Sequence, residues 1–444
     1  MKYQSYQLHN YTSIEGMSKL SATDRKAIEI TGRVLPFKVN NYVAGELIDW
    51  SNIAEDPIFT LCFPRKEMLQ NAHFEKVEQL VDSGASETLI KETVSAIRQT
   101  LNPNPAGQHL NVPRIGNVKL NGVQHKYRET VLFFPSQGQT CHAYCTFCFR
   151  WPQFSGMDGM KFAMKETELL TKYLRKHQEV TDLLFTGGDP LTMNSARIAD
   201  YVDSLLDNRL QNIQTIRFGT KALAYWPYRF LTDSDSDDLM RVFDKIVRAG
   251  KNLAIMAHFN HPVELSTNAV QEAIRRVRST GAQIRTQSPV LNHINNKPEL
   301  WAEMWRKQVN LNCIPYYMFV ARDTGAKEFF DVPLVDCWNV FRKAYQQVSG
   351  VCRTVRGPSM SATPGKIQIL GVSEIHGEKV FVLRFLQGRN PDWVDRPFFA
   401  KFDPEASWLN MLQPAFGEQK FFFEDELEAF YHEDYRQSEA ENFE

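Results

Sequence analysis

Three cysteines lie within one short segment of the chain, CHAYCTFCFR, as Cys141, Cys145 and Cys148. Thiolates at this spacing can hold three irons of a [4Fe–4S] cluster and leave the fourth iron open. An electron-transfer cluster usually has a protein thiolate on every iron, so an open iron indicates a cluster that binds another molecule. A structural zinc site is the alternative, but zinc prefers four ligands, and His142 is the only fourth ligand nearby. The pattern favours an iron–sulfur cluster.

A glycine pair follows an apolar run about forty residues after the cysteines, in LLFTGGDPL (Gly187, Gly188, Asp189). Two glycines let a backbone approach a ligand closely. The amide groups and the Asp189 carboxylate can then receive an ammonium or a carboxylate group. A Gly-Gly-Asp turn is weak by itself, but after the cysteine motif it predicts a ligand site.

Strand-like and helix-like segments alternate after the cysteines, which is typical of a parallel sheet with helices outside it. Helical spacing is clear at Val270, Ala273, Ile274 and Val277, closed by Gly281. The sequence therefore predicts an α/β fold with a full or partial (β/α) barrel and chemistry at the carboxyl ends of its strands. The predicted strands are Thr130–Phe134, Asp182–Thr186, Thr215–Gly219, Leu253–Phe259, Gln283–Val290 and Cys313–Val320.

Three regions are predicted: residues 1–122, 123–350 and 351–444. The first is a helical, polar N-terminal region with Lys76–Gln99 as its clearest helix, and it ends in a connecting loop, Asn102–Gly122. The second is the barrel. The third is a small β-rich extension with a hairpin, Ile367–Val372 and Val380–Phe385 around His376-Gly377, and an acidic, aromatic tail, Phe421–Glu444, expected to be a solvated helix.

The composition fits one large enzyme with appendages: 444 residues, 43% hydrophobic, 23% charged, net charge −1. With a net charge near zero, the protein has no overall positive field that would attract nucleic acid or an anionic membrane. No segment is typical of a signal peptide or a membrane span. Seven cysteines, of which four are scattered, do not suggest a disulfide framework, so a reducing cytoplasm is expected.

Further motifs occur in the order and spacing of one known family. They are IRFGTK (Ile216–Lys221), HFNHP (His258–Pro262), TQS (Thr286–Ser288), IPYY (Ile314–Tyr317) and PGK (Pro364–Lys366), with DPI at Asp56–Ile58. With the cysteine and GGD motifs, the chain resembles the lysine 2,3-aminomutase family of radical S-adenosylmethionine (radical SAM) enzymes from about residue 45 to 390. The resemblance implies a [4Fe–4S] cluster, SAM, pyridoxal 5′-phosphate (PLP) and transfer of an α-amino group to the adjacent carbon through a 5′-deoxyadenosyl radical.

The resemblance also implies roles for single residues. Lys366 would form the Schiff base with PLP, the alternative being a surface lysine that opens a strand. Lys126 and Arg128 would contact the PLP phosphate, although one family arginine falls on Thr130 here. Cofactor contacts would come from Gly187, Gly188, Asp189, Arg217, His258, Gln287 and Tyr316.

The substrate pocket departs from the lysine-specific pattern. Arg150 would bind the substrate α-carboxylate through its planar fork. Where lysine-specific members have two aspartates, this chain has Arg322 and either Ser359 or Arg356, depending on the alignment. An ammonium and a guanidinium about 4 Å apart would repel by about 4 kcal/mol at an effective dielectric constant of about 20. An acidic or polar, glutamate-like substrate is therefore expected, unless Arg322 points outward and Asp323 turns in.

Other implications concern partners and rival functions. A low-potential reductant such as flavodoxin or ferredoxin is expected, and a homo-oligomer is allowed. Zinc-linked dimerisation is not expected, since no cysteine follows Cys352. The rivals are a lysine 2,3-aminomutase proper, a radical SAM protein that has lost PLP, and an electron-transfer or iron-sensing protein.

Overall fold

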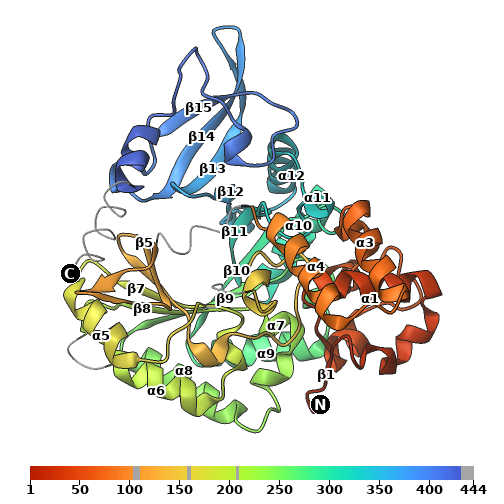
Figure 1. Cartoon of the computed structure of the whole chain (residues 1–444). Coiled ribbons are helices and arrows are strands. Elements are labelled where there is room, and N and C mark those ends of the chain that lie inside the picture. The colour runs from red at the N-terminus through yellow and green to blue at the C-terminus, as the bar shows by residue number, and fades with distance from the viewer. Residues whose placement is uncertain (104–110, 158–161, 207–209, 432–444) are drawn as a thin grey trace.

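A sheet of eleven strands organises the chain (Figure 1), and the computed structural model describes residues 1–103, 111–157, 162–206 and 210–431. From β6 to β12 each strand pairs in parallel with the next strand of the chain. This order without reversal is that of a (β/α) barrel. The strands are β6 (Thr130–Phe133), β7 (Asp182–Phe185), β8 (Thr215–Thr220), β9 (Asn252–His258), β10 (Gln283–Val290), β11 (Ile314–Val320) and β12 (Arg356–Ser361).

Helices connect these strands along the outside of the sheet (Figure 1). In α9 the predicted apolar residues are buried, Thr267 caps the first turn by accepting from the Val270 amide, and Gly281 follows with φ +86°. The α/β class is confirmed, and β12 is a strand that the sequence patterns did not reveal. The connecting helices are α5 (Thr167–Lys176), α6 (Ser195–Leu205), α8 (Ser236–Arg248), α9 (Asn268–Ser279), α10 (Pro298–Asn310) and α12 (Leu334–Gln346).

The same sheet continues beyond the parallel strands at both edges. At one edge β5 (Val123–Tyr127) pairs antiparallel with β6. At the other, β13 (Gly365–Ile375), β14 (Glu378–Gly388) and β15 (Pro397–Lys401) follow β12 in antiparallel order. The hairpin predicted around His376-Gly377 is β13–β14, and both turn residues have positive φ, 51° and 79°. The boundary proposed at residue 350 thus falls inside one continuous sheet.

The N-terminal region contains α1 (Ala22–Val34), α2 (Pro57–Cys62), α3 (Asn71–Asp82) and α4 (Glu87–Thr100). The single helix predicted over Lys76–Gln99 is wrong, because Gly84, with φ +65°, interrupts it between α3 and α4. Ser86 then caps α4 by accepting from the Leu89 amide.

The end of the described chain is helical over residues 424–431. The residues just before this helix, which we predict to be solvated, are largely buried. Phe421 and Phe423 are buried, and the Phe423 ring lies 5.1 Å from that of Phe385 and 5.6 Å from that of Phe398. Aromatic burial, not exposure, therefore holds this segment. Residues 432–444 of the predicted tail and 104–110 of the predicted loop lie outside the described residues.

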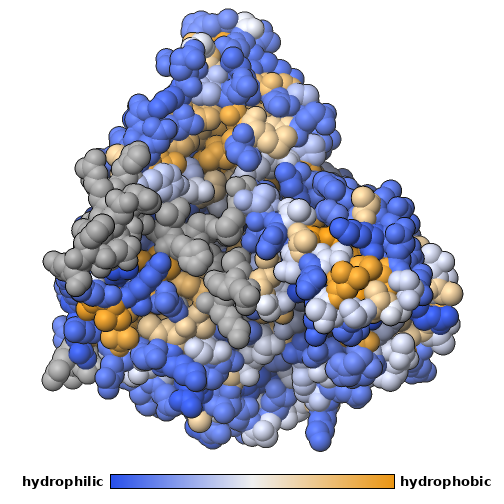
Figure 2. All heavy atoms as spheres, viewed as in Figure 1, coloured by the Kyte–Doolittle hydropathy of each residue, from blue (hydrophilic) through white to orange (hydrophobic). Residues whose placement is uncertain are grey.

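Hydrophilic side chains cover most of the face seen in Figure 2, with apolar residues gathered in a few patches. Within the described ranges, no helix is both long and apolar enough to cross a membrane.

Candidate active site

The cysteine loop (residues 139–150) follows β6 and is hydrogen-bonded to the N-terminal region. The Tyr144 amide donates to the Lys38 carbonyl at 2.8 Å, and the Thr146 amide donates to the Leu61 carbonyl at 2.9 Å. The Thr146 hydroxyl adds a bond to the Thr60 carbonyl at 2.8 Å. The N-terminal region is thus part of the scaffold that positions the cysteines.

The three cysteines of this loop are free and are partly buried as residues. Burial raises the pKa of each thiol, and Asp189 and the other two cysteines raise that of Cys141 further. Thiols that repel one another once ionised need a positively charged partner such as iron. Their types and proximity therefore fit a cluster bound by one thiolate per iron.

A zinc ion would need His142 as its fourth ligand beside the three cysteines. Among the described residues, no group of three or more His, Cys, Asp or Glu side chains could hold a single metal ion. The His142 ring lies edge-on to Tyr3, with the two centroids 5.8 Å apart, and burial lowers the pKa of His142 to about 3.

The glycine pair after β7 packs against the cysteine loop. A Cβ on Gly188 would lie 2.4 Å from the Thr140 carbonyl oxygen, and one on Gly187 would lie 2.2 Å from Nε2 of Gln139. The Asp189 amide donates to the same Thr140 carbonyl at 2.6 Å. An added Cβ would thus meet the residues just before Cys141, and the approach of these glycines to a ligand stays a prediction.

The Asp189 carboxylate is engaged by the protein. It accepts from the Thr220 hydroxyl at 2.8 Å, the Lys221 amide at 2.9 Å and the Leu191 amide at 3.0 Å. These bonds join the glycine turn to the carboxyl end of β8, and they occupy the oxygens that we predicted for a ligand ammonium. The structure therefore gives Asp189 a positioning role between the cysteine loop and the sheet.

Lys366 is the second residue of β13 and lies at the carboxyl end of β12. Its Nζ atom donates to Oε1 of Gln387 at 3.1 Å and lies 4.1 Å from the centroid of the Tyr317 ring. Burial, with smaller contributions from Arg217 and Arg356, lowers the pKa of Lys366 to about 7. A large fraction of this amine is uncharged near neutral pH, which is the form that attacks a carbonyl. Lys366 is thus a partly buried side chain at the start of β13 rather than an exposed one.

Arg150 and Arg322 are brought together at the end of the cysteine loop. Their guanidinium carbons lie 5.0 Å and 5.3 Å from the centroid of the Phe149 ring. Burial lowers the pKa of both groups, that of Arg150 to about 10. Nε of Arg322 is buried without a hydrogen-bond partner in the described chain. Arg322 therefore points inward, and Asp323 beside it is also buried, with 9% of its surface exposed.

The two candidates for the second side-chain position differ in orientation. The Arg356 guanidinium carbon lies 4.4 Å from the Tyr316 ring centroid and 4.5 Å from that of Tyr317, the ring that Lys366 also contacts. Ser359 is completely buried, and its hydroxyl donates to the Met318 carbonyl at 3.4 Å. Arg356 thus shares the neighbourhood of Lys366, whereas the Ser359 hydroxyl bonds to the main chain of β11.

The two predicted phosphate ligands are separated. Lys126 of β5 donates from Nζ to the Ala362 carbonyl, just before Lys366, and burial holds its pKa well below the usual range. Arg128 is exposed in the β5–β6 turn. The structure therefore brings Lys126, but not Arg128, to the end of the sheet that carries Lys366.

Other predicted cofactor residues lie on the same strands. Arg217 of β8 forms an ion pair with Asp182 of β7 at 2.6 Å. His258 ends β9, and its Nε2 atom lies 2.6 Å from Nε2 of the Gln287 amide, on β10. Burial, with Lys221 and Arg150 nearby, lowers the pKa of His258 to about 3, so its imidazole is neutral.

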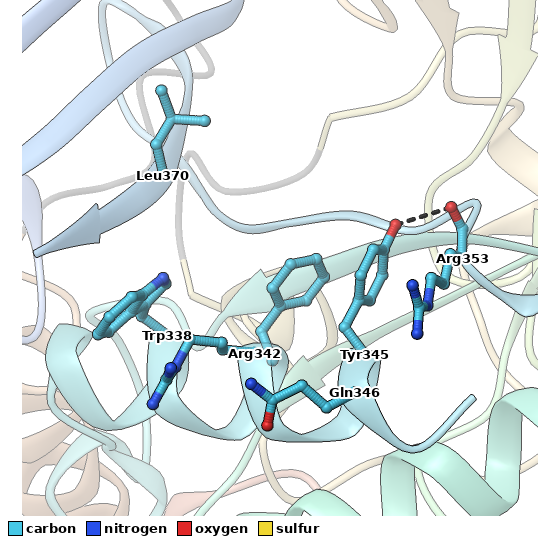
Figure 3. A pocket seen from close by; sticks show the side chains of 7 residues that line it. Trp338, Arg342, Tyr345, Gln346, Arg353 and Leu370 are labelled. Carbon is cyan, nitrogen blue, oxygen red and sulfur yellow. Dashed lines mark hydrogen bonds between the residues drawn. The ribbon is translucent and has the colours of Figure 1, made fainter. Parts of the chain in front are cut away.

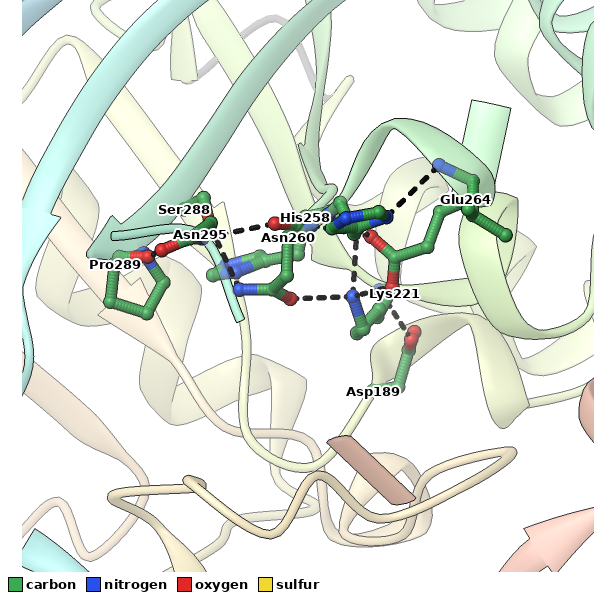
Figure 4. A network of polar contacts seen from close by, with 10 residues as sticks. Asp189, Lys221, His258, Asn260, Glu264, Ser288, Pro289 and Asn295 are labelled. Carbon is green, nitrogen blue, oxygen red and sulfur yellow. Dashed lines mark hydrogen bonds and ion pairs between the residues drawn. The ribbon is translucent and has the colours of Figure 1, made fainter. Parts of the chain in front are cut away.

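A polar network beside the cysteine loop was not predicted (Figure 4). Lys221 donates from Nζ to Glu264 at 2.6 Å and to Asn260 at 2.7 Å, and Asn260 donates to Ser288 at 2.8 Å. Asn295 donates to the Asn260 carbonyl at 2.9 Å. Lys221 and Asn260 lie in motifs that the sequence singled out, but Glu264 has no sequence signal of its own.

One cavity lies away from these residues. It has a volume of about 340 Å³ and lies between α12 and β13 (Figure 3). Its lining residues are Trp338, Phe341, Arg342, Tyr345, Gln346, Arg353 and Leu370.

Comparison with known proteins gives consistent relatives. No family model matches the chain. A protein of Aquifex aeolicus assigned as an L-lysine 2,3-aminomutase is 27% identical over 404 residues, 91% of this chain and 95% of that protein. The L-lysine 2,3-aminomutase of Methanococcus maripaludis is 24% identical over 70% of this chain and 60% of its own length. The glutamate 2,3-aminomutase of Clostridioides difficile is 26% identical over 48% of this chain and 47% of its own length.

Solved structures resemble the chain more distantly. A radical SAM methyltransferase from Sphaerobacter thermophilus is 14% identical, with a TM-score of 0.38 over 65% of this chain and 94% of that one. A likeness of this size carries no argument about activity. From the sequence relatives, the chain is a radical SAM enzyme of the lysine 2,3-aminomutase family, which implies a [4Fe–4S] cluster and SAM as its cofactors.

Proposed function

We propose that this chain is a PLP-dependent radical SAM 2,3-aminomutase that moves the α-amino group of an acidic or polar, glutamate-like amino acid to C3. One observation carries the proposal. A lysine with a pKa lowered to about 7, Lys366, lies at the carboxyl end of the parallel strands, where Arg150 and Arg322 also lie, and it shares the Tyr317 ring with Arg356. In the described part of the chain, none of these three guanidinium groups forms an ion pair with a carboxylate.

The cysteine loop would hold the cluster, with Cys141, Cys145 and Cys148 on three irons. With SAM, the cluster would supply the radical chemistry at this loop. Supply of the electron requires a low-potential donor such as flavodoxin or ferredoxin. The chain itself contributes the loop geometry: bonds to the N-terminal region, to the glycine turn and, through Asp189, to β8.

Lys366 would hold PLP through its amine, and PLP supplies the carbonyl chemistry that carries the amino nitrogen. The uncharged amine can attack a carbonyl without first losing a proton to solvent. Lys126, whose amine reaches the carbonyl of Ala362 close to Lys366, would lie near the PLP phosphate. Arg356 on the Tyr316 and Tyr317 rings keeps a positive charge beside Lys366, which helps to hold the lysine pKa low.

Arg150 and Arg322 would hold the substrate. Two buried guanidinium groups against one ring repel each other, and a molecule with two carboxylates between them removes that repulsion. A lysine substrate would instead add a third positive charge. The family includes a protein named glutamate 2,3-aminomutase, which supports an acidic substrate for this chain as well.

The test is an anaerobic assay of the reconstituted full-length protein with glutamate, aspartate, glutamine and lysine, in which β-amino acid products are detected by mass. A β-amino acid formed from glutamate, with 5′-deoxyadenosine, is the expected result. Cluster formation and SAM cleavage without bound PLP or any β-amino acid would contradict the mutase proposal and favour a radical SAM protein that has lost PLP.

A lysine 2,3-aminomutase is the second candidate, and Asp323 favours it. This carboxyl group follows Arg322 directly and is also buried, so a carboxylate lies beside the proposed pocket. The extensive match with the Aquifex aeolicus protein points the same way. Exclusive turnover of lysine in the same assay would select this candidate.

A further inference from the structure

Lys38, in the N-terminal region, contacts the residues around Cys141 from both its main chain and its side chain. Its Nζ atom donates to the Cys141 carbonyl at 2.8 Å and lies 3.3 Å from the Thr140 hydroxyl. Its carbonyl accepts from the Tyr144 amide at 2.8 Å. The chain therefore fixes one ammonium group on the main chain of the first cysteine.

The neighbouring Asn40 makes the same connection rigid. Its amide donates to the His142 carbonyl at 3.2 Å and to the Tyr225 carbonyl at 2.8 Å, and the side chain is completely buried. Its Oδ1 atom accepts from the Val43 amide at 2.9 Å. A side chain bonded on three sides cannot shift easily, so Lys38 two residues earlier is held in place against the cysteine loop.

Among the described residues, three cations lie near the cysteines, Lys38, Lys221 and Arg150, and their charges are balanced differently. Lys221, near Cys145, is paired with Glu264 at 2.6 Å. Arg150, near Cys148, faces the proposed substrate site. Lys38 forms no ion pair with a carboxylate anywhere in the described residues, and its other neighbour is the Tyr144 ring, 5.7 Å from Nζ to the centroid.

A positive charge that no carboxylate offsets stabilises negative charge placed next to it, most strongly where water is partly excluded. One-electron reduction adds a negative charge to an iron–sulfur cluster, and nearby charge and hydrogen bonds are among the factors that set its reduction potential. Lys221 is less effective in this respect, since Glu264 cancels much of its field.

We propose that Lys38 is a positioning and charge-setting residue of the cluster site: its ammonium group, fixed on the Cys141 carbonyl, favours the reduced cluster. The inference rests on the proposed cluster at Cys141, Cys145 and Cys148. The electron comes from the low-potential donor and goes to the cluster, and no other bond changes in this step. This assigns to the N-terminal region an electronic role in addition to its structural one.

The test is a potentiometric titration of the reconstituted protein followed by electron paramagnetic resonance, with iron and sulfide contents measured for each sample. Lys38→Gln removes the charge but keeps a hydrogen-bond donor, and Lys38→Arg keeps both the charge and a donor. Lys19→Gln, which removes the charge of an exposed lysine in the same region, is the control. We expect a more negative midpoint reduction potential for Lys38→Gln. At a fixed potential, the ratio of reduced to oxidised cluster should fall on the order of tenfold, which corresponds to a shift of about 59 mV for one electron. Lys38→Arg and Lys19→Gln should titrate like the unmodified protein.

Each outcome decides the matter. A full cluster in Lys38→Gln with an unchanged midpoint overturns the inference. Failure of Lys38→Gln to assemble a cluster, with normal assembly in Lys38→Arg, supports the need for a positive charge. Failure of both variants overturns it, since the role of Lys38 is then purely structural. Absence of a cluster from the unmodified protein refutes the proposed function instead, which keeps the two failures distinguishable.

Discussion

Arg150 and Arg322 come from segments far apart in the chain, yet their guanidinium groups lie against the same phenylalanine ring, that of Phe149. Arg150 belongs to the cysteine loop, and Arg322 lies two residues after Val320, the last residue of β11. The charge of Arg322 raises the cost of charge on Arg150, and in the described residues neither guanidinium forms an ion pair with a carboxylate, although Asp323 lies near enough to Arg322 to favour its charged form. An anionic ligand relieves this repulsion, and the predictions on substrate follow from that relationship.

Substrate preference should change with the charge of residue 322. In the unmodified protein we expect a higher kcat/KM for glutamate than for lysine. Arg322→Asp, alone or with Ser359→Asp, should shift the ratio toward lysine by at least about tenfold, or 1.4 kcal/mol, because a cation repulsion becomes an attraction. Arg342→Asp, in the remote cavity on α12, is the matched control and should leave the ratio unchanged. Efficient lysine turnover by the unmodified protein, without activity on acidic amino acids, would refute a substrate-binding role for Arg322. Asp323 would then be the residue that contacts the substrate side chain.

Arg150→Lys should weaken substrate binding while the cluster still forms. An ammonium group keeps the charge but cannot form the two parallel hydrogen bonds that a guanidinium gives a carboxylate. We expect KM to rise by about tenfold, in line with the loss of one charged hydrogen bond of about 1.5 kcal/mol or more. Steady-state kinetics with an unchanged iron content measures this. Normal KM and kcat in Arg150→Lys would exclude a carboxylate role.

Attachment of PLP to Lys366 should depend on pH in a defined direction. Burial lowers the pKa of this amine to about 7, so the reactive, uncharged form increases as the pH rises through 7 and is nearly complete above about 8. The initial rate of borohydride-trapped PLP incorporation should follow that curve. Lys366→Ala should keep the cluster, lose the covalent label and lose turnover by orders of magnitude. A rate of PLP incorporation that rises only above pH 9 would show that the pKa of Lys366 is that of an ordinary lysine.

Cys145→Ala should abolish cluster assembly and SAM cleavage with little loss of fold. The residue lies in a loop with no regular secondary structure, so the β-sheet should persist, as judged by circular dichroism. Cys352→Ala, a buried cysteine outside the loop, is a control for the general effect of losing a thiol. A full [4Fe–4S] spectrum in Cys145→Ala would refute the assignment of the ligands.

Gly188→Ala should destabilise the protein through the cysteine loop. The added Cβ would lie 2.4 Å from the Thr140 carbonyl oxygen and 2.6 Å from its amide nitrogen, so one backbone must move. We expect a loss of about 1–3 kcal/mol in the free energy of unfolding, together with poorer cluster assembly. Gly350→Ala, where nothing lies within 4 Å and φ is not positive, is the matched control that adds a Cβ without a clash. Equal stability and iron content in Gly188→Ala and the unmodified protein would contradict the packing role.

The barrel could be predicted because its signals are local. Strand β10 has the bounds Gln283–Val290 in both the prediction and the structure, since a short apolar run between two helical patterns leaves few choices. The break at Gly84 was missed because the apolar pattern continues across it. Strand β12 was missed because Arg356–Ser361, with its proline, glycine and serines, is a strand only through pairing with β11 and β13.

For the site, the sequence by itself determined which groups are present: three thiols, a glycine pair, a Gly-Lys and a surplus of cations in place of two aspartates. Tertiary structure decided what each can do. Neighbours distant in the chain lower the pKa of Lys366, engage the Asp189 carboxylate, separate Lys126 from Arg128 and place Lys38 on Cys141. The physical reason is that periodicity and turn preferences act over a few residues, whereas burial and charge proximity depend on which strand ends the folded sheet brings together.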